Sequence, residues 1–351
     1  MKNITTITAA AKRPTLLDIA RECGLSRATV ARALSGKGYV NPQRRQLIHD
    51  TAERLGYRTS AIARALRTQK SATIGVLIAD ITNPIFPEIV KGIDEAVSVD
   101  NYTLFLCNTD EDVVKQRALI RSLLDRQVDG LILISQTVAD EALALLQAGP
   151  PCVFVNRRPD PLFGDYIGPD NAMGVAQLLE HLYALGHRRM AYVAGPAASS
   201  TAQERRACFI REMARLGCPV PEGFIIAGSY QGESGRLAAA ALLECAPPPT
   251  AILAPNDFVA LEIIAFLNER GLRVPDDISV TGFDDAFKLG VGGLYALRAQ
   301  GLTTIDQPKR QLGRLAGEAL LKRMAQPGAP FATTLLPTLL AVRDSTAPAK
   351  S

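Results

Sequence analysis

Residues 15–34 read Thr15-Leu-Leu-Asp-Ile-Ala-Arg-Glu-Cys-Gly-Leu-Ser-Arg-Ala-Thr-Val-Ala-Arg-Ala-Leu34, a pattern typical of two short helices joined by a tight turn. The apolar positions 16, 19, 20 and 23 fall on one face of a helix that Thr15 can cap. Gly24 favours the left-handed turn that ends a helix, and Ser26 can cap a second helix from Arg27 to about Leu34. Two helices joined in this way form a helix-turn-helix, whose second helix lies in the major groove of DNA.

The second helix has distinct inner and outer faces. Val30, Ala33 and Leu34 fit a buried face, which turns Arg27, Ala28 and Arg32 toward DNA. Arginine can donate two hydrogen bonds to the edge of a guanine, and alanine can contact the methyl group of a thymine.

A third helix is predicted from Asn41-Pro42 to Leu55-Gly56, with Asn41 as its cap and proline at its first position. Its inward face is expected to carry Leu47, Ile48, Ala52 and Leu55, so that the three helices share one small core. Tyr57 is expected to pack against this core, with contact to a base as the alternative.

The distribution of charge agrees with a head that binds a polyanion. The first seventy residues carry 14 Lys/Arg and 4 Asp/Glu, while residues 71–351 carry 25 and 31. A solvated basic tail would be poor in apolar residues, but this segment shows helical periodicity throughout. We therefore expect a nucleic-acid-binding domain at this end of the chain.

From residue 73 onward, short aliphatic runs alternate with amphipathic stretches, which predicts parallel sheets covered by helices on both faces. About 280 residues are many for one such core, so two lobes are expected. The aliphatic runs are Ile74–Ile78, Leu104–Cys107, Leu131–Ile134, Cys152–Val155, Met190–Ala194, Ala251–Leu253 and Ser279–Phe283. The helical stretches include Pro87–Val99, Val113–Arg126, Ala172–Leu185, Glu204–Leu216 and Gly235–Leu243.

The chain resembles the lactose-repressor/galactose-repressor family of bacterial transcription regulators, through motifs that recur in the family's order from residue 15 to beyond residue 300. In the head these are Thr15-Leu-x-Asp-Ile-Ala, Gly24-x-Ser26-x-x-Thr29-Val30-x-Arg32, Val40-Asn41 and Leu55-Gly56-Tyr57. In the body they include Asn83-Pro84-x-Phe86, Asp129-Gly-Leu-Ile, Asn156-Arg157, Asp170-Asn171-x-x-Gly174, Asn256-Asp257, Gly282-Phe-Asp-Asp285 and Leu302-Thr-Thr-Ile305-x-Gln307-Pro308.

The resemblance implies a homodimeric repressor that binds double-stranded operator DNA and responds to a small molecule. It implies a small all-α helix-turn-helix head (14–59), a hinge helix and linker (60–70), and an α/β body (71–346) of two lobes like those of periplasmic binding proteins. The chain is expected to cross between the lobes near residues 168, 300 and 335. The residues expected to contact DNA are Thr15, Leu16, Ser26, Arg27, Ala28, Thr29, Arg32, Asn41, Tyr57, Ala63 and Leu66.

The hinge segment, from Ser60 to Leu66, is too short to hold a helix by itself in water, so it is expected to order on DNA. Leu66 matches the residue that wedges into the minor groove in the family, and an ordinary packed leucine is the alternative. The family usually has asparagine where this chain has Ser60, which can still cap the helix.

Several polar residues directly follow aliphatic runs, at the strand ends where open α/β sheets bind ligands. The residues expected to line an effector cleft between the lobes, partly by family match, are Phe86, Asn156, Arg157, Arg205, Tyr230, Asn256 and Asp284. Carboxylates, amides, an arginine and an aromatic wall suit a sugar or sugar derivative. Arg157 with Arg158 leaves an acidic ligand open as the alternative.

The chain departs from the family between Asp285 and Leu302, where the linker is longer than usual, so the contour of that side of the cleft stays open. The glycines of that linker do not form a dinucleotide-binding motif, and no cofactor is expected. Six scattered cysteines and three histidines give no metal-ligand spacing, which predicts reduced and mostly buried thiols.

The remaining expectations concern location, assembly and competing classes. The chain has no long apolar run, so neither export nor membrane insertion is predicted, and the bacterial cytosol at the nucleoid is expected. A dimer is favoured over a tetramer because the end from Asp344 to Ser351 has no heptad repeat. A secreted sugar-transport protein would lack the basic head, and no motif of an enzyme is found. Repressor is favoured over activator by resemblance only.

Overall fold

The structure is a computed structural model that describes residues 14–36, 38–57, 70–137, 140–288 and 298–350. The chain divides into two compact units, Met1–Ser71 and Ala72–Ser351. We call them the head and the body. The predicted combination of an all-α head with an α/β body is confirmed.

The head contains three helices whose first residues are fixed by side-chain caps. Helix α1 (Leu16–Cys23) begins at Thr15, which forms a capping box with Asp18, and it ends at Gly24 with φ of +63°. Helix α2 (Arg27–Ser35) is capped by Ser26. Helix α3 (Pro42–Arg54) is capped by Asn41, with proline at its first turn. The predicted boundaries of the helix-turn-helix therefore hold to within one residue.

The three helices of the head share one small core. Ile19, Val30, Ala33 and Ile48 are buried in it, and Leu16, Leu34, Leu55 and Tyr57 pack at its margin. The prediction that Leu47 faces inward is wrong, because its side chain is 48% exposed. Successive helical residues are about 100° apart, so the burial of Ile48 turns its neighbour toward solvent.

The first lobe of the body contains a parallel six-stranded sheet in the order β11-β5-β4-β3-β1-β2. The strands are β1 (Thr73–Ile78), β2 (Thr103–Asn108), β3 (Gly130–Ile134), β4 (Cys152–Val155), β5 (Asp165–Pro169) and β11 (Thr333–Leu336). Helices α5 (Ile85–Val97) and α13 (Lys309–Ala325) enclose a core on one face of the sheet. Helices α6 (Val113–Asp125) and α7 (Asp140–Gln147) enclose another on the opposite face, which explains why the central strands β3 and β4 are apolar throughout.

Helices α5 and α13 approach each other at two glycines. A Cβ on Gly313 would lie 1.9 Å from the carbonyl oxygen of Ile89, and a Cβ on Gly92 would lie 2.1 Å from that of Arg310. Because any larger residue would push the helices apart, glycine at both positions is what lets α13 pack closely on α5.

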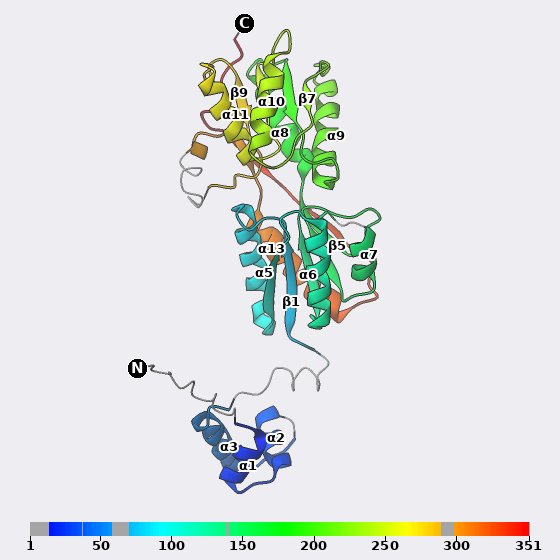
Figure 1. The fold of residues 1–351 in the computed structure, drawn as a ribbon, viewed down its shortest axis with the longest axis vertical. Helices are drawn as coiled ribbons and strands as arrows, with labels where there is room; N and C mark the ends of the chain where they lie inside the picture. The colour runs from blue at the N-terminus through cyan, green and yellow to red at the C-terminus, as the bar shows by residue number, and fades with distance from the viewer. Residues whose placement is uncertain (1–13, 37, 58–69, 138–139, 289–297, 351) are drawn as a thin grey trace, which may run out of the picture. The chain divides into compact units, whose positions relative to one another are not determined.

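The second lobe contains a parallel four-stranded sheet in the order β7-β6-β8-β9. The strands are β6 (Met190–Val193), β7 (Ile225–Ile226), β8 (Ala251–Leu253) and β9 (Ser279–Thr281). Helices α8 (Asn171–Ala184) and α9 (Ser200–Arg215) pack on one face of the sheet, and α10 (Glu233–Leu243) and α11 (Asp257–Glu269) pack on the other (Figure 1).

The chain passes between the lobes after β5, after β10 (Thr304–Asp306) and before β12 (Leu339–Ala341), which pairs antiparallel with β10. The predicted crossings near 168 and 335 agree with this path, whereas the one predicted near 300 lies at 307–308. The crossing comes later than predicted because the chain first forms β10 in the second lobe. There it makes isolated β-bridges such as the one between Asp284 and Asp306. Strands β5, β7, β10, β11 and β12 are absent from the predicted runs, and all are five residues or shorter.

Candidate functional site

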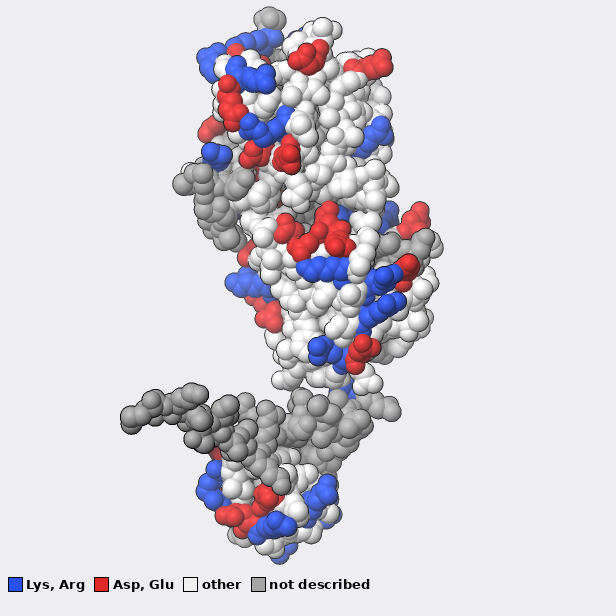
Figure 2. Space-filling view, in the orientation of Figure 1, with Lys and Arg blue, Asp and Glu red and all other residues white. Residues whose placement is uncertain are grey.

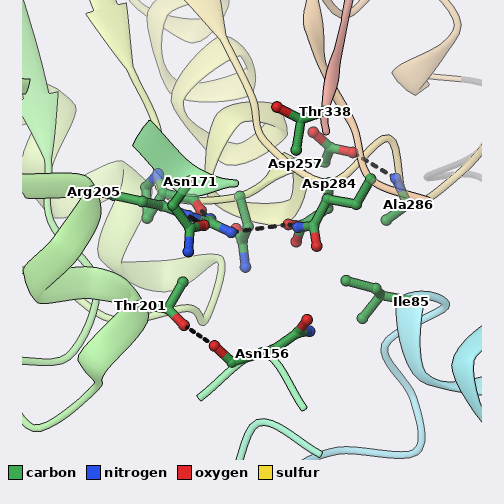
Figure 3. Close-up of polar contacts among 12 residues, drawn as sticks. Ile85, Asn156, Asn171, Thr201, Arg205, Asp257, Asp284, Ala286 and Thr338 are labelled. Atoms are coloured by element: carbon green, nitrogen blue, oxygen red, sulfur yellow. Dashed lines mark hydrogen bonds and ion pairs between the residues drawn. The ribbon is translucent and has the colours of Figure 1, made fainter. Parts of the chain in front are cut away.

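A cleft opens between the lobes at the carboxyl ends of strands from both sheets, with a volume of about 130 Å³. Asn156 directly follows β4, Asn256 follows β8 and caps α11, and Asp284 follows β9. Figure 3 shows Asn156, Arg205 and Asp284 converging there from different elements. The structure brings all seven predicted effector residues to this cleft: Phe86, Asn156, Arg157, Arg205, Tyr230, Asn256 and Asp284.

Arg205 is the buried cation on the second-lobe side of the cleft. Its Nε donates to Asn171 Oδ1 at 2.8 Å, and its Nη1 donates to the carbonyl oxygen of Pro255 at 2.8 Å. Its Nη2 lies 3.7 Å from Asp284 Oδ1, and its guanidinium stacks on Phe283. The predicted helical stretch Glu204–Leu216 begins four residues too late, because Ser199 caps α9 (Ser200–Arg215) and places Arg205 in the second turn.

Asp284 is held in an unusual backbone conformation, with φ of +118°, and Asn156 has φ of +66°. Such backbone conformations in residues other than glycine are uncommon and cluster at binding sites. Gln307 Nε2 donates to Asp284 Oδ1. Burial raises the pKa of Asp284 to about 6, although Arg205 and Lys309 oppose the rise.

Arg157 lies on the first-lobe side of the cleft and is engaged on three sides. Its Nη2 is 2.8 Å from Glu111 Oε1, its Nη1 donates to Thr137 Oγ1 at 3.3 Å, and its guanidinium lies over the ring of Tyr230. The neighbouring Arg158 stacks on Tyr166 instead and is absent from the cleft lining. The paired arginines that suggested an acidic ligand therefore do not act together.

Two buried acceptors at the cleft have no partner among the described residues. They are Asn156 Oδ1 and Gln307 Oε1, on side chains that are 7% and 2% exposed. A buried acceptor without a donor is costly, so a ligand that donates hydrogen bonds would relieve both atoms.

Several lining residues are missing from the predicted set, including Asp80, Glu111, Ser135, Thr201, Phe258 and Gln307. Asp80 and Ser135 follow β1 and β3 closely, so the rule of strand ends could have found them. Gln307 stands in a quoted family motif. Glu111 gives no such signal, because it lies in an acidic turn with φ of +57°.

In the head, the predicted DNA-contacting side chains have three kinds of surroundings. Arg27, Ala28 and Arg32 are exposed on α2. Thr15, Ser26 and Asn41 cap helices, and the Thr29 hydroxyl lies 2.9 Å from that of Ser26. Leu16 and Tyr57 pack against the core of the head, as expected for Tyr57. Ala63 and Leu66 lie outside the described residues.

Two further features, a metal site and a membrane-spanning helix, are absent from the described residues. No three His, Cys, Asp or Glu side chains there come together as a metal site would require. In the same part of the chain, no helix has the length and apolar character to cross a bilayer.

Comparisons with known proteins agree with this architecture. A family model described as "Bacterial regulatory proteins, lacI family" matches residues 15–60, and one described as "Periplasmic binding protein-like domain" matches residues 179–346. The HTH-type transcriptional repressor PurR of Photobacterium profundum is 34% identical over 312 residues, which are 88% of this chain and 92% of that protein.

Solved structures extend the likeness to the whole fold. The lac repressor dimer bound to operator and the anti-inducer ONPF aligns with a TM-score of 0.83 at 29% identity, covering 96% of this chain and 100% of that one. A LacI family regulator from Enterococcus faecium with bound ribose aligns with a TM-score of 0.67 at 29% identity, covering 79% and 100%. These relatives are regulators of transcription rather than enzymes. The chain belongs to the lacI family of bacterial regulatory proteins.

Proposed function

We propose that the protein is a repressor that binds operator DNA as a homodimer, and that a sugar or sugar derivative in the cleft changes its affinity for the operator. The proposal places it in the bacterial cytosol, at the nucleoid. The DNA-binding side rests on the exposed arginines of α2 and on the likeness to the lac repressor dimer bound to operator.

The observation that carries the effector half is that polar side chains of both lobes line one cleft. Asn156 and Arg157 come from the first lobe, while Arg205 and Asp284 come from the second. A ligand can shift a conformational balance only by its difference in affinity for the two forms. A ligand that bridges the lobes has such a difference, because opening the cleft separates its partners. The regulator with bound ribose supports a sugar as its class.

The test measures operator binding by the full-length protein in the presence of a panel of sugars, sugar acids, sugar phosphates and nucleobases. Operator duplexes are first selected from random sequences with the protein itself, and binding is followed by fluorescence anisotropy. We expect at least one sugar or sugar derivative to change operator affinity. A response confined to nucleobases would contradict the sugar class.

Variants at the cleft then separate the two activities. Arg205→Ala and Asp284→Asn should weaken ligand binding by roughly 1–3 kcal/mol each, because each removes one partner of a buried hydrogen bond. Operator binding without ligand should stay near that of the wild type. Arg206→Ala serves as the control, since Arg206 is exposed on the same helix. Normal ligand binding by both cleft variants in calorimetry would show that the effector binds elsewhere.

A further inference from the structure

The charges around the cleft are nearly balanced and already paired. Among the described lining residues, Arg157 and Arg205 are the cations, and Asp80, Glu111 and Asp284 are the carboxylates. Each arginine faces one carboxylate, Arg157 at 2.8 Å from Glu111 and Arg205 at 3.7 Å from Asp284. On the face shown in Figure 2, acidic side chains also gather where the first lobe meets the second, over the beginning of α6.

The two guanidinium groups have little left to offer an anion. Recognition of a phosphate or carboxylate by arginine uses two parallel N–H donors on one edge of the fork. Arg157 directs Nη2 to Glu111 and Nη1 to Thr137, while the ring of Tyr230 covers its face. Arg205 directs Nε and Nη1 to protein oxygens, with Phe283 on its face. An anionic ligand would have to break these contacts first.

The two buried cleft atoms that have no partner among the described residues are both acceptors. Gln307 Nε2 donates to Asp284, which fixes the orientation of that amide and leaves its Oε1 to face a donor. Asn156 Nδ2 donates to Ser135 Oγ at 3.3 Å. Asn156 Oδ1, like Gln307 Oε1, is therefore left without a donor. Hydroxyl groups of a ligand can donate to both atoms, whereas a phosphate would set its lone pairs against theirs.

We infer that the cleft takes an uncharged, hydroxyl-rich ligand and discriminates against phosphorylated and acidic forms, with Glu111 as the residue that sets this specificity. Glu111 does so by holding Arg157 in an ion pair. The inference rests on the proposed function for its biological meaning, but the charge balance can be tested without knowing the effector.

Inorganic phosphate is the probe, and the melting temperature of the full-length protein is the readout. Glu111→Gln removes the charge that pairs with Arg157. Phosphate at about ten times its Kd for this variant should therefore raise the melting temperature of the variant by about 3 °C more than that of the wild type. Glu111→Gln combined with Arg157→Gln should lose that increment. Glu269→Gln is the matched control, because it removes one carboxylate partner of an arginine, Arg236, on the surface of the second lobe, where Glu262 stays 3.7 Å away. Phosphate binding to the basic head is common to all variants and cancels in the comparison.

Equal phosphate shifts in the wild type and in Glu111→Gln would overturn the inference. Matched pairs give a second reading, with glucose beside glucose 6-phosphate and gluconate, and ribose beside ribose 5-phosphate. Stronger stabilisation of the wild type by a charged member than by its parent sugar also overturns it. A phosphate increment in Glu111→Gln, with no effect of any sugar or derivative on operator binding, would remove the proposed function and leave the charge inference standing.

Discussion

Asp257, the first residue of α11, has both carboxyl oxygens bonded beneath the cleft. Oδ1 accepts from Thr304 Oγ1 at 2.6 Å, and Oδ2 accepts from the backbone N–H of Ala286 at 2.8 Å. Burial raises the pKa of Asp257 to about 7, and the nearby charge of Asp284 adds to the rise. The folded protein therefore binds a proton at this site more tightly than the unfolded chain does.

This pKa predicts how stability depends on pH. A carboxyl whose pKa is raised on folding stabilises the native state below its unfolded pKa of about 4, and that stabilisation is lost as pH rises through about 7. The free energy of unfolding in urea should therefore fall between pH 5 and 8, by roughly 1–4 kcal/mol from this site. Asp257→Asn should flatten the fall, whereas Asp276→Asn at an exposed position should keep it. An unchanged slope in Asp257→Asn would contradict the prediction.

At the scale of elements, α2 presents two exposed arginines, Arg27 and Arg32. If Arg27 and Arg32 read bases, replacing either by alanine should cost about 1–3 kcal/mol on the selected operator and relax specificity at one base pair. If they contact phosphates, specific and random DNA should be weakened equally, with a shallower salt dependence. Anisotropy titrations on both kinds of DNA at several salt concentrations distinguish these outcomes.

The elements also show where sequence reasoning succeeds. Caps at Thr15, Ser26 and Asn41 mark helix starts because each satisfies backbone N–H groups that the helix leaves open. Long apolar runs predict the central strands well, since both faces of the sheets are covered. Strands β10 and β12 are missed by the sequence analysis because they pair with each other over only three residues. Glu111 is missed as a cleft residue because its ion-pair partner, Arg157, lies 46 positions away in the sequence.

At the scale of the whole molecule, β2 forms an edge of the six-stranded sheet and exposes large apolar side chains. Phe105 is 39% exposed and Leu106 is 44% exposed, and an apolar edge strand invites pairing with another chain. We therefore place part of the proposed dimer contact on this edge of the body.

Leu106→Glu should weaken the dimer by roughly 10–100-fold, because a buried leucine contributes about 1.5–3 kcal/mol. Leu237→Glu, at a position that is 68% exposed on α10, should leave the dimer intact. Analytical ultracentrifugation at micromolar concentration measures the dimerisation of both variants. A Leu106→Glu protein that dimerises like the wild type would exclude β2 from the contact.

Helix α13 and strand β11 complete the first lobe although they are among the last elements of the chain to be synthesised. Because the ribosome releases the chain from its N-terminus, the sheet of that lobe lacks an edge strand and a covering helix until residue 336 has emerged. The head needs nothing beyond Tyr57 for its core. A late nonsense mutation should therefore yield a polypeptide with a finished helical head and an unfinished body, which keeps the fold of the head and loses the cleft.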